Sequence, residues 1–421
     1  MSTQNLIQVT PKALRKHSAN CIKSKTPFFV WGNPGIGKSR ILQSLVESMG
    51  YHFEDIRLSQ IESVDLRGLP AKEEGPDGVT VVWAMPDFLR RAKEQWEKYK
   101  KPTAFFFDEL NSGSPATMAA AYQFINDRRI GCFELGAHDV VFAAGNLESD
   151  GGVTNAMPLP LANRFRHYIM NVSTEQWLDY ASEAGQHPYV LAYLSVQGNS
   201  SKLQDFNVDK LMASVEKAYA TPRSWEMLSK GLYSIYGEKV NLQNTQYDAE
   251  ELEALKSLEA LDEEESLGDN DIAVVAASCV GSAIAVDFAA FVKEGMNLPK
   301  ARDILAGKKF DIDIKSKGSA QYFIANDCSH ALKEMKDKLS SIKEAKGESS
   351  DEYVKFLKDE FMPAMENYIL FASDKFAREL FVYGVITVML KRYKVIPRPQ
   401  HMNPKVFALI STEFKKAKLS N

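Results

Sequence analysis

What this sequence lacks excludes several kinds of protein. It has only four cysteines in 421 residues, and none is close enough to another to form a CxxC pair. We therefore expect neither a disulfide framework nor a cysteine zinc site. The seven histidines show no metal-ligand spacing either. Buried, reduced thiols are the simplest interpretation of the four cysteines, which are Cys21, Cys132, Cys279 and Cys328.

Long apolar runs and a large excess of positive charge are also missing. No stretch of 18 or more apolar residues occurs, so no membrane-spanning helix is expected, and the first nine residues are too polar for a signal peptide. The formal net charge of −4 argues against a broad nucleic-acid-binding surface but permits a local basic patch. We expect a cytoplasmic protein of two or three domains.

The clearest motif is a glycine-rich segment with the pattern of a P-loop. Residues 32–39 read Gly-Asn-Pro-Gly-Ile-Gly-Lys-Ser and match G-x-x-x-x-G-K-[ST] at every defined position. They lie between a short apolar run, residues 27–31, and a segment with helical spacing, residues 39–50. Backbone N–H groups of such a loop surround phosphates at the positive end of the following helix. The predicted nucleotide-binding residues are Gly32, Asn33, Pro34, Gly35, Ile36, Gly37, Lys38, Ser39 and Arg40.

Two further apolar runs end in polar side chains. Residues 103–107 are followed by Asp108 and Glu109, and residues 139–144 are followed shortly by Asn146. Because such runs alternate with helical segments, we predict an α/β fold with a parallel sheet flanked by helices. The polar side chains would then meet at the carboxyl edge of the sheet, where ligands of such folds bind.

Roles in phosphoryl transfer follow from these positions. Lys38 would contact the β- and γ-phosphates of ATP, while Ser39 and Asp108 would hold Mg²⁺. Glu109 would orient and polarise the attacking water. Asn146 would contact the γ-phosphate or the same water. A strand-terminal Asp-Glu pair alone is often only a cap, so this assignment depends on the P-loop upstream.

Together these motifs resemble the AAA+ ATPases of the helix-two-insert clade, which includes MoxR-like proteins, the dynein and midasin modules, and McrB-type motors. The P-loop corresponds to Walker A, residues 105–109 to Walker B and Asn146 to sensor 1. Residues 65–70 and 82–87 resemble the flanks of the hairpin that this clade carries in its second helix. The resemblance covers roughly residues 5–236.

The same resemblance implies two functional arginines. Arg164, in an Asn-Arg-Phe sequence, stands where the family carries an arginine finger that acts on the neighbouring subunit. Arg223 stands at the sensor 2 position. Arg166 and Arg128 remain alternatives for the finger. Asn163 occupies a position where MoxR-like proteins commonly have aspartate, a departure on which the catalytic assignment does not depend.

We expect three regions along the chain. Residues 1–172 would form the AAA+ α/β core, residues 173–300 an all-helical lid, and residues 301–421 a helical C-terminal region. An acidic stretch within the lid, residues 248–271, is interpreted as an exposed linker or insertion. Helices are expected at residues 11–25, 115–127, 174–185, 208–220, 221–236, 271–295 with an interruption at Gly281 and Ser282, 321–345, 351–390 with breaks, and 403–418.

The resemblance implies Mg²⁺-dependent ATP hydrolysis by a homo-oligomeric ring, expected to be a hexamer, that remodels a partner as MoxR-like chaperones do. The partner would be a protein, such as one with a von Willebrand A domain. Two alternatives stay open. A nucleic-acid-directed motor of the McrB type would be supported by basic pore residues such as Arg67, Lys72 or Arg90, and an ATP-gated assembly scaffold is disfavoured by the intact Glu109. Core packing rather than base stacking is expected for the tryptophans Trp83, Trp96, Trp177 and Trp225.

Overall fold

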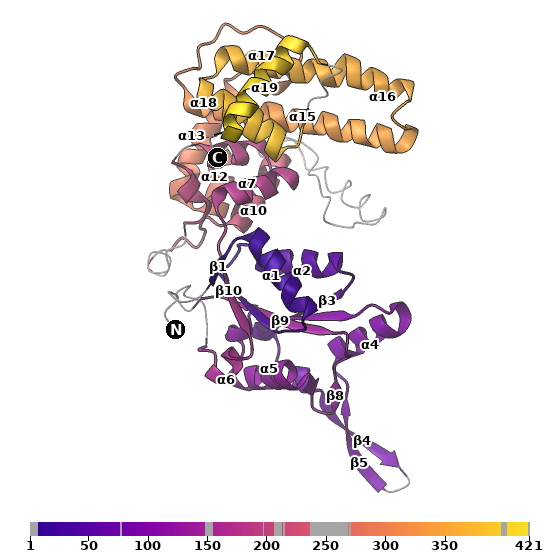
Figure 1. Cartoon of the computed structure of the whole chain (residues 1–421). Coiled ribbons are helices and arrows are strands. Elements are labelled where there is room, and N and C mark those ends of the chain that lie inside the picture. Colours follow the sequence, from indigo (N-terminus) through magenta and orange to yellow (C-terminus); the bar gives the residue numbers. More distant parts are fainter. Residues whose placement is uncertain are drawn as a thin grey trace. The chain divides into compact units, whose positions relative to one another are not determined.

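The computed structural model describes residues 7–75, 78–147, 155–196, 198–205, 213, 215–235, 268, 271–396 and 402–419. Contacts among them divide the chain into two compact units. Unit 1 holds the residues before Thr174, together with Ala213, and unit 2 holds the rest. Each unit is described by itself (Figure 1).

Unit 1 is built on a six-stranded sheet in which every neighbouring pair of strands is parallel. A parallel sheet with both faces covered needs strands that are apolar throughout, and the three central strands meet this requirement because nearly all of their residues are buried. In spatial order the strands are β1 (Ile7–Val9), β10 (Arg166–Met170), β2 (Phe28–Trp31), β9 (Val140–Gly145), β6 (Thr103–Asp108) and β3 (His52–Arg57).

Helices cover both faces of this sheet, so the predicted α/β fold is confirmed (Figure 1). Side chains alternate between the faces along a strand, which places Phe105 and Phe107 in one apolar cluster and Phe106 in the other. The first cluster includes Phe88 of α4 and Phe124 of α5. The second cluster is completed by α1 and α2. These four helices are α1 (Pro11–Lys23), α2 (Lys38–Ser48), α4 (Asp87–Tyr99) and α5 (Pro115–Asp127).

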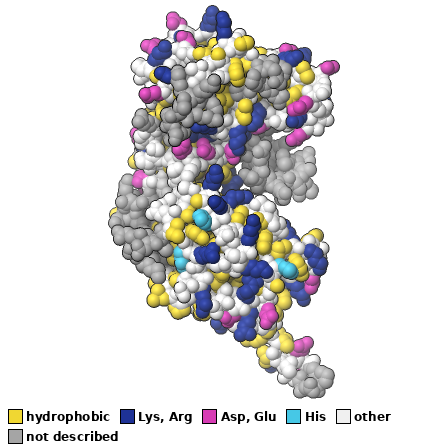
Figure 2. Space-filling view, viewed as in Figure 1, with side chains coloured by type: hydrophobic (Ala, Val, Ile, Leu, Met, Phe, Trp, Pro, Cys, Tyr) yellow, Lys and Arg dark blue, Asp and Glu magenta, His cyan; other side chains and the backbone are white. Residues whose placement is uncertain are grey.

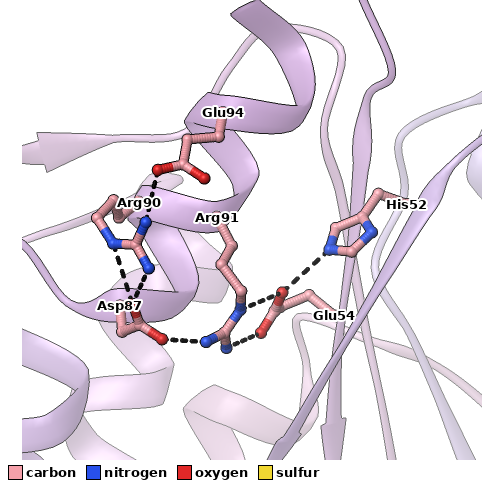
Figure 3. A network of polar contacts seen from close by, with 6 residues as sticks. All are labelled: His52, Glu54, Asp87, Arg90, Arg91 and Glu94. Carbon is pink, nitrogen blue, oxygen red and sulfur yellow. Dashed lines mark hydrogen bonds and ion pairs between the residues drawn. The ribbon is translucent and has the colours of Figure 1, made fainter. Parts of the chain in front are cut away.

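The edge strand β3 carries a buried charge that the packing of α4 neutralises. Glu54 is only 5% exposed. Its carboxylate accepts hydrogen bonds from the Arg91 guanidinium, one of them 3.3 Å long, and lies 3.2 Å from Nε2 of His52 (Figure 3). Burial by itself raises the pKa of Glu54, but the hydrogen bonds and charges of His52 and Arg91 outweigh it and lower that pKa. Asp87, also on α4, pairs with Arg91 in turn.

A two-stranded antiparallel hairpin leaves the sheet between the short helix α3 (Ser63–Arg67) and α4, as the resemblance predicts. Its strands are β4 (Leu69–Gly75) and β5 (Gly78–Ala84). Figure 2 shows hydrophobic side chains along it. The expectation that Trp83 packs in the core is wrong, because this residue of the hairpin is 45% exposed.

The other tryptophans and the cysteines give mixed outcomes. Trp177 and Trp225 are buried, as expected. Trp96, 36% exposed, instead stacks on His138 at the surface, with ring centroids 4.2 Å apart. All four cysteines are free, but only Cys21 and Cys328 are buried. Cys132 is exposed in the turn between the short strands β7 (Arg129–Ile130) and β8 (Phe133–Glu134), and Cys279 is half-buried.

Unit 2 is helical throughout its described part. Its longest helix, α15, has 29 residues and packs against α8 and the π-helical segment η9 (Val382–Arg392). None of the described helices is long and apolar enough to cross a membrane. The remaining elements are α7 (Thr174–Glu183), α8 (Pro188–Ser195), α10 (Pro222–Ile235), α12 (Ile272–Val280), α13 (Ser282–Met296), α14 (Ala301–Leu305), α15 (Gly318–Lys346), α16 (Asp351–Lys355), η8 (Phe356–Phe361), α17 (Met362–Lys375), α18 (Arg378–Phe381) and α19 (Pro404–Leu419).

Most of the predicted helices are confirmed in this unit, with one correction. The helix expected over residues 208–220 is absent from residues 216–220, which are irregular, and residues 208–212 lie outside the described part. The interruption expected within residues 271–295 is confirmed at Gly281, whose φ of 88° cannot continue a right-handed helix. The acidic stretch lies outside the described residues apart from Gly268 and Asp271.

Because it contains two buried histidines, unit 2 is expected to lose stability in acid. Burial lowers the pKa of His187 to about 3 and that of His330 to about 4, from the usual 6.5. Both are neutral when folded, so the unfolded chain takes up more protons as the pH falls below 6.5. The free energy of unfolding should therefore decrease between pH 6.5 and about 4, by roughly 1.4 kcal/mol per pH unit for each histidine.

Urea unfolding of the chain at several pH values, followed by the fluorescence of the buried Trp177 and Trp225, measures this slope. His330→Gln should flatten it, whereas the control His138→Gln, at an exposed residue of unit 1, should not. An identical slope in the wild type and His330→Gln would show that His330 contributes nothing to the acid sensitivity.

Candidate active site

The carboxyl ends of the central strands bring the predicted site residues together. Trp31 of β2 is in register with Gly145 of β9, and Phe107 of β6 with Ala143 of β9. The loop that begins at Gly32, the residues after β9 and the residues after β6 therefore leave the sheet at the same edge, where the sequence predicts a nucleotide-binding site.

The P-loop turns tightly between β2 and α2. Gly35 and Gly37 have φ values of 76° and 90°, which favour glycine. A Cβ on Gly32 would lie 2.6 Å from Cδ1 of Ile36 and 3.1 Å from the backbone oxygen of Met170, so a side chain would not fit there. The loop leads directly into the first turn of α2, whose free N–H groups favour anions.

Lys38 lies inside this loop and is only 7% exposed. Its Nζ donates to the carbonyl oxygens of Gly32, at 2.6 Å, and Asn33, at 3.1 Å, and to Oδ1 of Asn146 at 3.0 Å. The contact between Lys38 and Asn146 joins two of the residues that the sequence predicts to surround the γ-phosphate. Arg40, the last residue of the predicted set, is exposed on α2.

Ser39 and Asp108 form the second group of the site. The Ser39 hydroxyl donates to Oδ2 of Asp108 at 2.7 Å. A hydroxyl next to a carboxylate supplies the hard oxygen ligands that Mg²⁺ prefers, and protein sites for Mg²⁺ usually leave further coordination to water and phosphate oxygens. No cluster of three acidic, histidine or cysteine residues that could hold a metal occurs in the described part.

Glu109 follows Asp108 in a left-handed conformation with a φ of 52°. Its Oε2 accepts a hydrogen bond from the hydroxyl of Ser59. Ser59 lies in the short helix η2 (Leu58–Gln60), directly after β3. A non-glycine residue with positive φ is uncommon and often marks a functional position. This conformation holds the Glu109 carboxylate beside Ser59 at the carboxyl edge of the sheet.

Ser59 and Asn111 were not predicted from the sequence. Asn111 is 1% exposed, and its Nδ2 donates to the backbone oxygen of Asn146 at 2.8 Å. A Cβ on Gly145 would lie 2.2 Å from Oδ1 of Asn111, so the pair fits only because residue 145 is glycine. Asn111 thereby fixes the backbone that carries the Asn146 side chain. The only sequence signal for Ser59 would have been its place after β3, a strand that the apolar pattern does not reveal.

The arginines differ in how they are held. Arg128 and Arg166 form hydrogen bonds within the chain. The guanidinium of Arg128 donates to the carbonyl oxygens of Gly136 and Asp139, both at 2.9 Å, and that of Arg166 donates to Oδ1 of Asn20 at 3.2 Å. The Arg164 side chain, just after α6 (Leu159–Ala162), is exposed and has no ion pair with another described residue. Arg223 is exposed on α10, in unit 2, and its role as sensor 2 stays a prediction.

Comparison with known proteins gives the class of this domain. Residues 28–131 match the family model described as "ATPase family associated with various cellular activities (AAA)". The matched segment contains the P-loop, Asp108 and Glu109. The chain therefore carries an ATPase domain, built on the α/β fold described above.

Individual relatives are distant. Midasin from Dictyostelium discoideum is 27% identical over 163 residues, which are 37% of this chain and 3% of midasin. A structure described as that of a "putative ATPase" from Cytophaga hutchinsonii aligns with 54% of this chain and 60% of its own, at 14% identity and a TM-score of 0.31. A lysine-to-arginine variant of RuvB from Thermotoga maritima aligns with 74% of this chain and 86% of its own, at 13% identity and a TM-score of 0.31. The MoxR-like subtype stays a prediction.

Proposed function

We propose that this protein is a cytoplasmic, Mg²⁺-dependent ATP hydrolase that works as a homo-oligomeric AAA+ ring, expected to be a hexamer, and remodels a partner protein. The observation that carries the hydrolase assignment is the meeting of Lys38, Ser39, Asp108 and Glu109 at one edge of the sheet. These residues come from two separate segments of the chain, and each has the chemistry that phosphoryl transfer to water requires.

The residues of the chain divide the work as follows. Lys38 would exchange its bonds to the carbonyls of Gly32 and Asn33 for bonds to the phosphates, which the backbone N–H groups of residues 32–40 other than Pro34 would surround. Ser39 and Asp108 would hold Mg²⁺, which would supply positive charge to the phosphates. Glu109 orients the attacking water and takes up its proton. Asn146, already in contact with Lys38, aligns the same water or the γ-phosphate.

The exposure of Arg164 supports the proposed ring. Its exposed guanidinium has no ion pair with another described residue, so it is available to a nucleotide bound by a neighbouring subunit. There it would stabilise the charge that develops in the transition state. Arg223, as sensor 2, would act from unit 2. The contacts of Arg128 and Arg166 within the chain make them weaker candidates for the finger.

A protein partner is favoured over nucleic acid by the exposed hairpin. One of its faces carries Val79, Val81 and Trp83, which are 64%, 63% and 45% exposed. The charges on the same face, Lys72 opposite Val81 and Glu74 opposite Val79, balance each other. An apolar, electrically balanced face suits a protein surface better than a phosphate backbone. A von Willebrand A domain protein of the kind bound by MoxR-like ATPases remains the partner that we propose.

Three basic residues, Arg67, Lys72 and Arg90, would support the alternative of a McrB-type motor. Arg90 is paired with Asp87 and Glu94 on its own helix, which leaves Arg67 and Lys72 of the three. The scaffold alternative, in which ATP binding alone matters, gives no role to a Glu109 held at the site by Ser59.

Lys38→Ala should abolish measurable ATP binding, because removal of one partner of a buried charge pair costs about 2–5 kcal/mol. Isothermal titration of the non-hydrolysable analogue AMP-PNP with Mg²⁺ measures the loss. Lys12→Ala, at an exposed lysine of α1, is the matched control and should bind like the wild type. Unchanged affinity in Lys38→Ala would remove the P-loop from the proposed function.

A further inference from the structure

A cleft in unit 2 is lined by residues that the proposed function does not use. It has a volume of about 550 Å³ and lies between α18, the exposed side of α19 and the loop before α15. Its deepest lining is apolar, since Phe376 is 3% and Phe381 7% exposed. Leu409 of α19, which is 38% exposed, extends this apolar lining toward the surface.

All of the charged side chains that line the same cleft are positive. Lys315, Arg378 and Lys405 line it from three different segments, and no aspartate or glutamate does. Lys315 and Lys405 are exposed, and neither forms an ion pair with another described residue. The cleft therefore presents an apolar floor with positive charges around it, in a protein whose net charge is negative.

We propose that this cleft binds an acidic amphipathic helix of a partner protein. The apolar stripe of such a helix would cover Phe376, Phe381 and Leu409, while its carboxylates would face the three cations. Complementary charge of this kind selects the partner and orients it, and burial of the apolar stripe supplies most of the affinity. The proposal does not depend on ATP turnover.

Two other occupants are less well matched. A nucleic acid would pair its phosphates with Lys315, Arg378 and Lys405 but would leave the apolar floor uncovered, and phosphate binding alone is weak with three cations. The acidic stretch of this chain, residues 248–271, has suitable charge, and the experiment below tests it separately.

The test is fluorescence anisotropy with the full chain, without nucleotide, at about 0.15 M salt so that long-range attraction is screened. The probe is a labelled helical peptide of about 18 residues with leucines at i, i+3, i+4 and i+7 and glutamates elsewhere. A second probe with glutamine in place of every glutamate keeps the apolar stripe. Saturable binding of the first probe, and binding of the second that is weaker by about tenfold or more, is expected.

Variants locate the site. Lys315→Glu with Lys405→Glu should weaken binding of the acidic probe by about tenfold or more, since two attractive contacts become repulsive. Leu409→Asn should also weaken it by removing apolar contact. The matched control, Lys293→Glu with Lys358→Glu, makes the same change of charge at exposed lysines of unit 2 outside the cleft and should leave binding unchanged.

Several results would overturn the proposal. Equal binding of both probes, equal loss in the control pair, or no saturation below about 1 mM would remove the acidic helix. A single-stranded oligonucleotide that competes with the peptide and loses affinity in the same variants would reassign the cleft to nucleic acid. Binding that emerges only after residues 262–265 are changed to serine would make the chain's own acidic stretch the occupant. Because Glu109→Gln should bind the probe like the wild type, failure here is distinguishable from failure of the proposed hydrolase.

Discussion

Glu109→Gln should bind ATP as tightly as the wild type and hydrolyse it about 10²–10⁴ times more slowly, the range over which a positioned general base accelerates proton transfer. Glutamine keeps the shape of the side chain and can still accept the hydrogen bond of Ser59, so the backbone conformation at residue 109 should persist. What it loses is the capacity to take a proton from water. The variant should therefore fill its sites with ATP and remain in that state.

Single-turnover hydrolysis, with affinity measured separately by titration, distinguishes this result from a folding defect. Light scattering should show a stable, high-mass species in the presence of ATP. Glu134→Gln, at an exposed glutamate of unit 1, is the matched control and should turn over normally. Near-normal turnover in Glu109→Gln would assign the activation of water to another residue.

Arg164→Ala should bind ATP normally and lose about 10³–10⁵ in turnover, as expected for an arginine finger supplied from a second subunit. The reason is that its guanidinium is exposed and not paired within the described part of its own chain, while the phosphate site is complete in its other side chains. For the same reason the specific activity of the wild type should rise with protein concentration, because a monomer would lack the finger. Turnover measured over a dilution series, together with sedimentation, tests both statements.

Mixing two inactive variants gives a sharper test of action between subunits. Arg164→Ala chains have an intact P-loop, and Lys38→Ala chains have an intact arginine, so a mixed ring would contain some complete sites. Partial recovery of activity is expected. Arg128→Ala and Arg166→Ala are matched controls that should keep most turnover, and a loss in either with normal ATP binding would move the finger there. Activity that stays constant on dilution while only monomer sediments would contradict the ring and the trans finger together.

The central strands could be predicted because both of their faces are buried. The run Ala104 to Phe107 contains no polar residue, and this pattern follows directly from helices on both sides of the sheet. The edge strand β3 could not be found in the same way, since its six residues include Glu54, Asp55 and Arg57. Its place depends on pairing with β6 and on Arg91, which the local sequence does not specify.

The residues of the candidate site also differ in whether the local sequence predicts them. The P-loop and the Asp108-Glu109 pair each consist of consecutive residues, so the chemistry of each can be inferred from a short segment. The contacts of Ser59 with Glu109, and of Asn111 with Asn146, join residues that are distant in sequence and depend on the strand order. Serine and asparagine are also common in turns, so composition alone does not distinguish a residue of the site from an ordinary loop residue.

The buried carboxylate of β3 has a consequence for how these molecules behave at high concentration. β3 is the last strand of the sheet, and an outer strand can recruit a strand from another molecule and begin aggregation. Glu54 is buried on this strand and is held by Arg91 of α4 and by His52, so a foreign strand that displaced α4 would leave the buried carboxylate without Arg91 (Figure 3). The ion pair with Arg91 thus disfavours the addition of a foreign strand at β3.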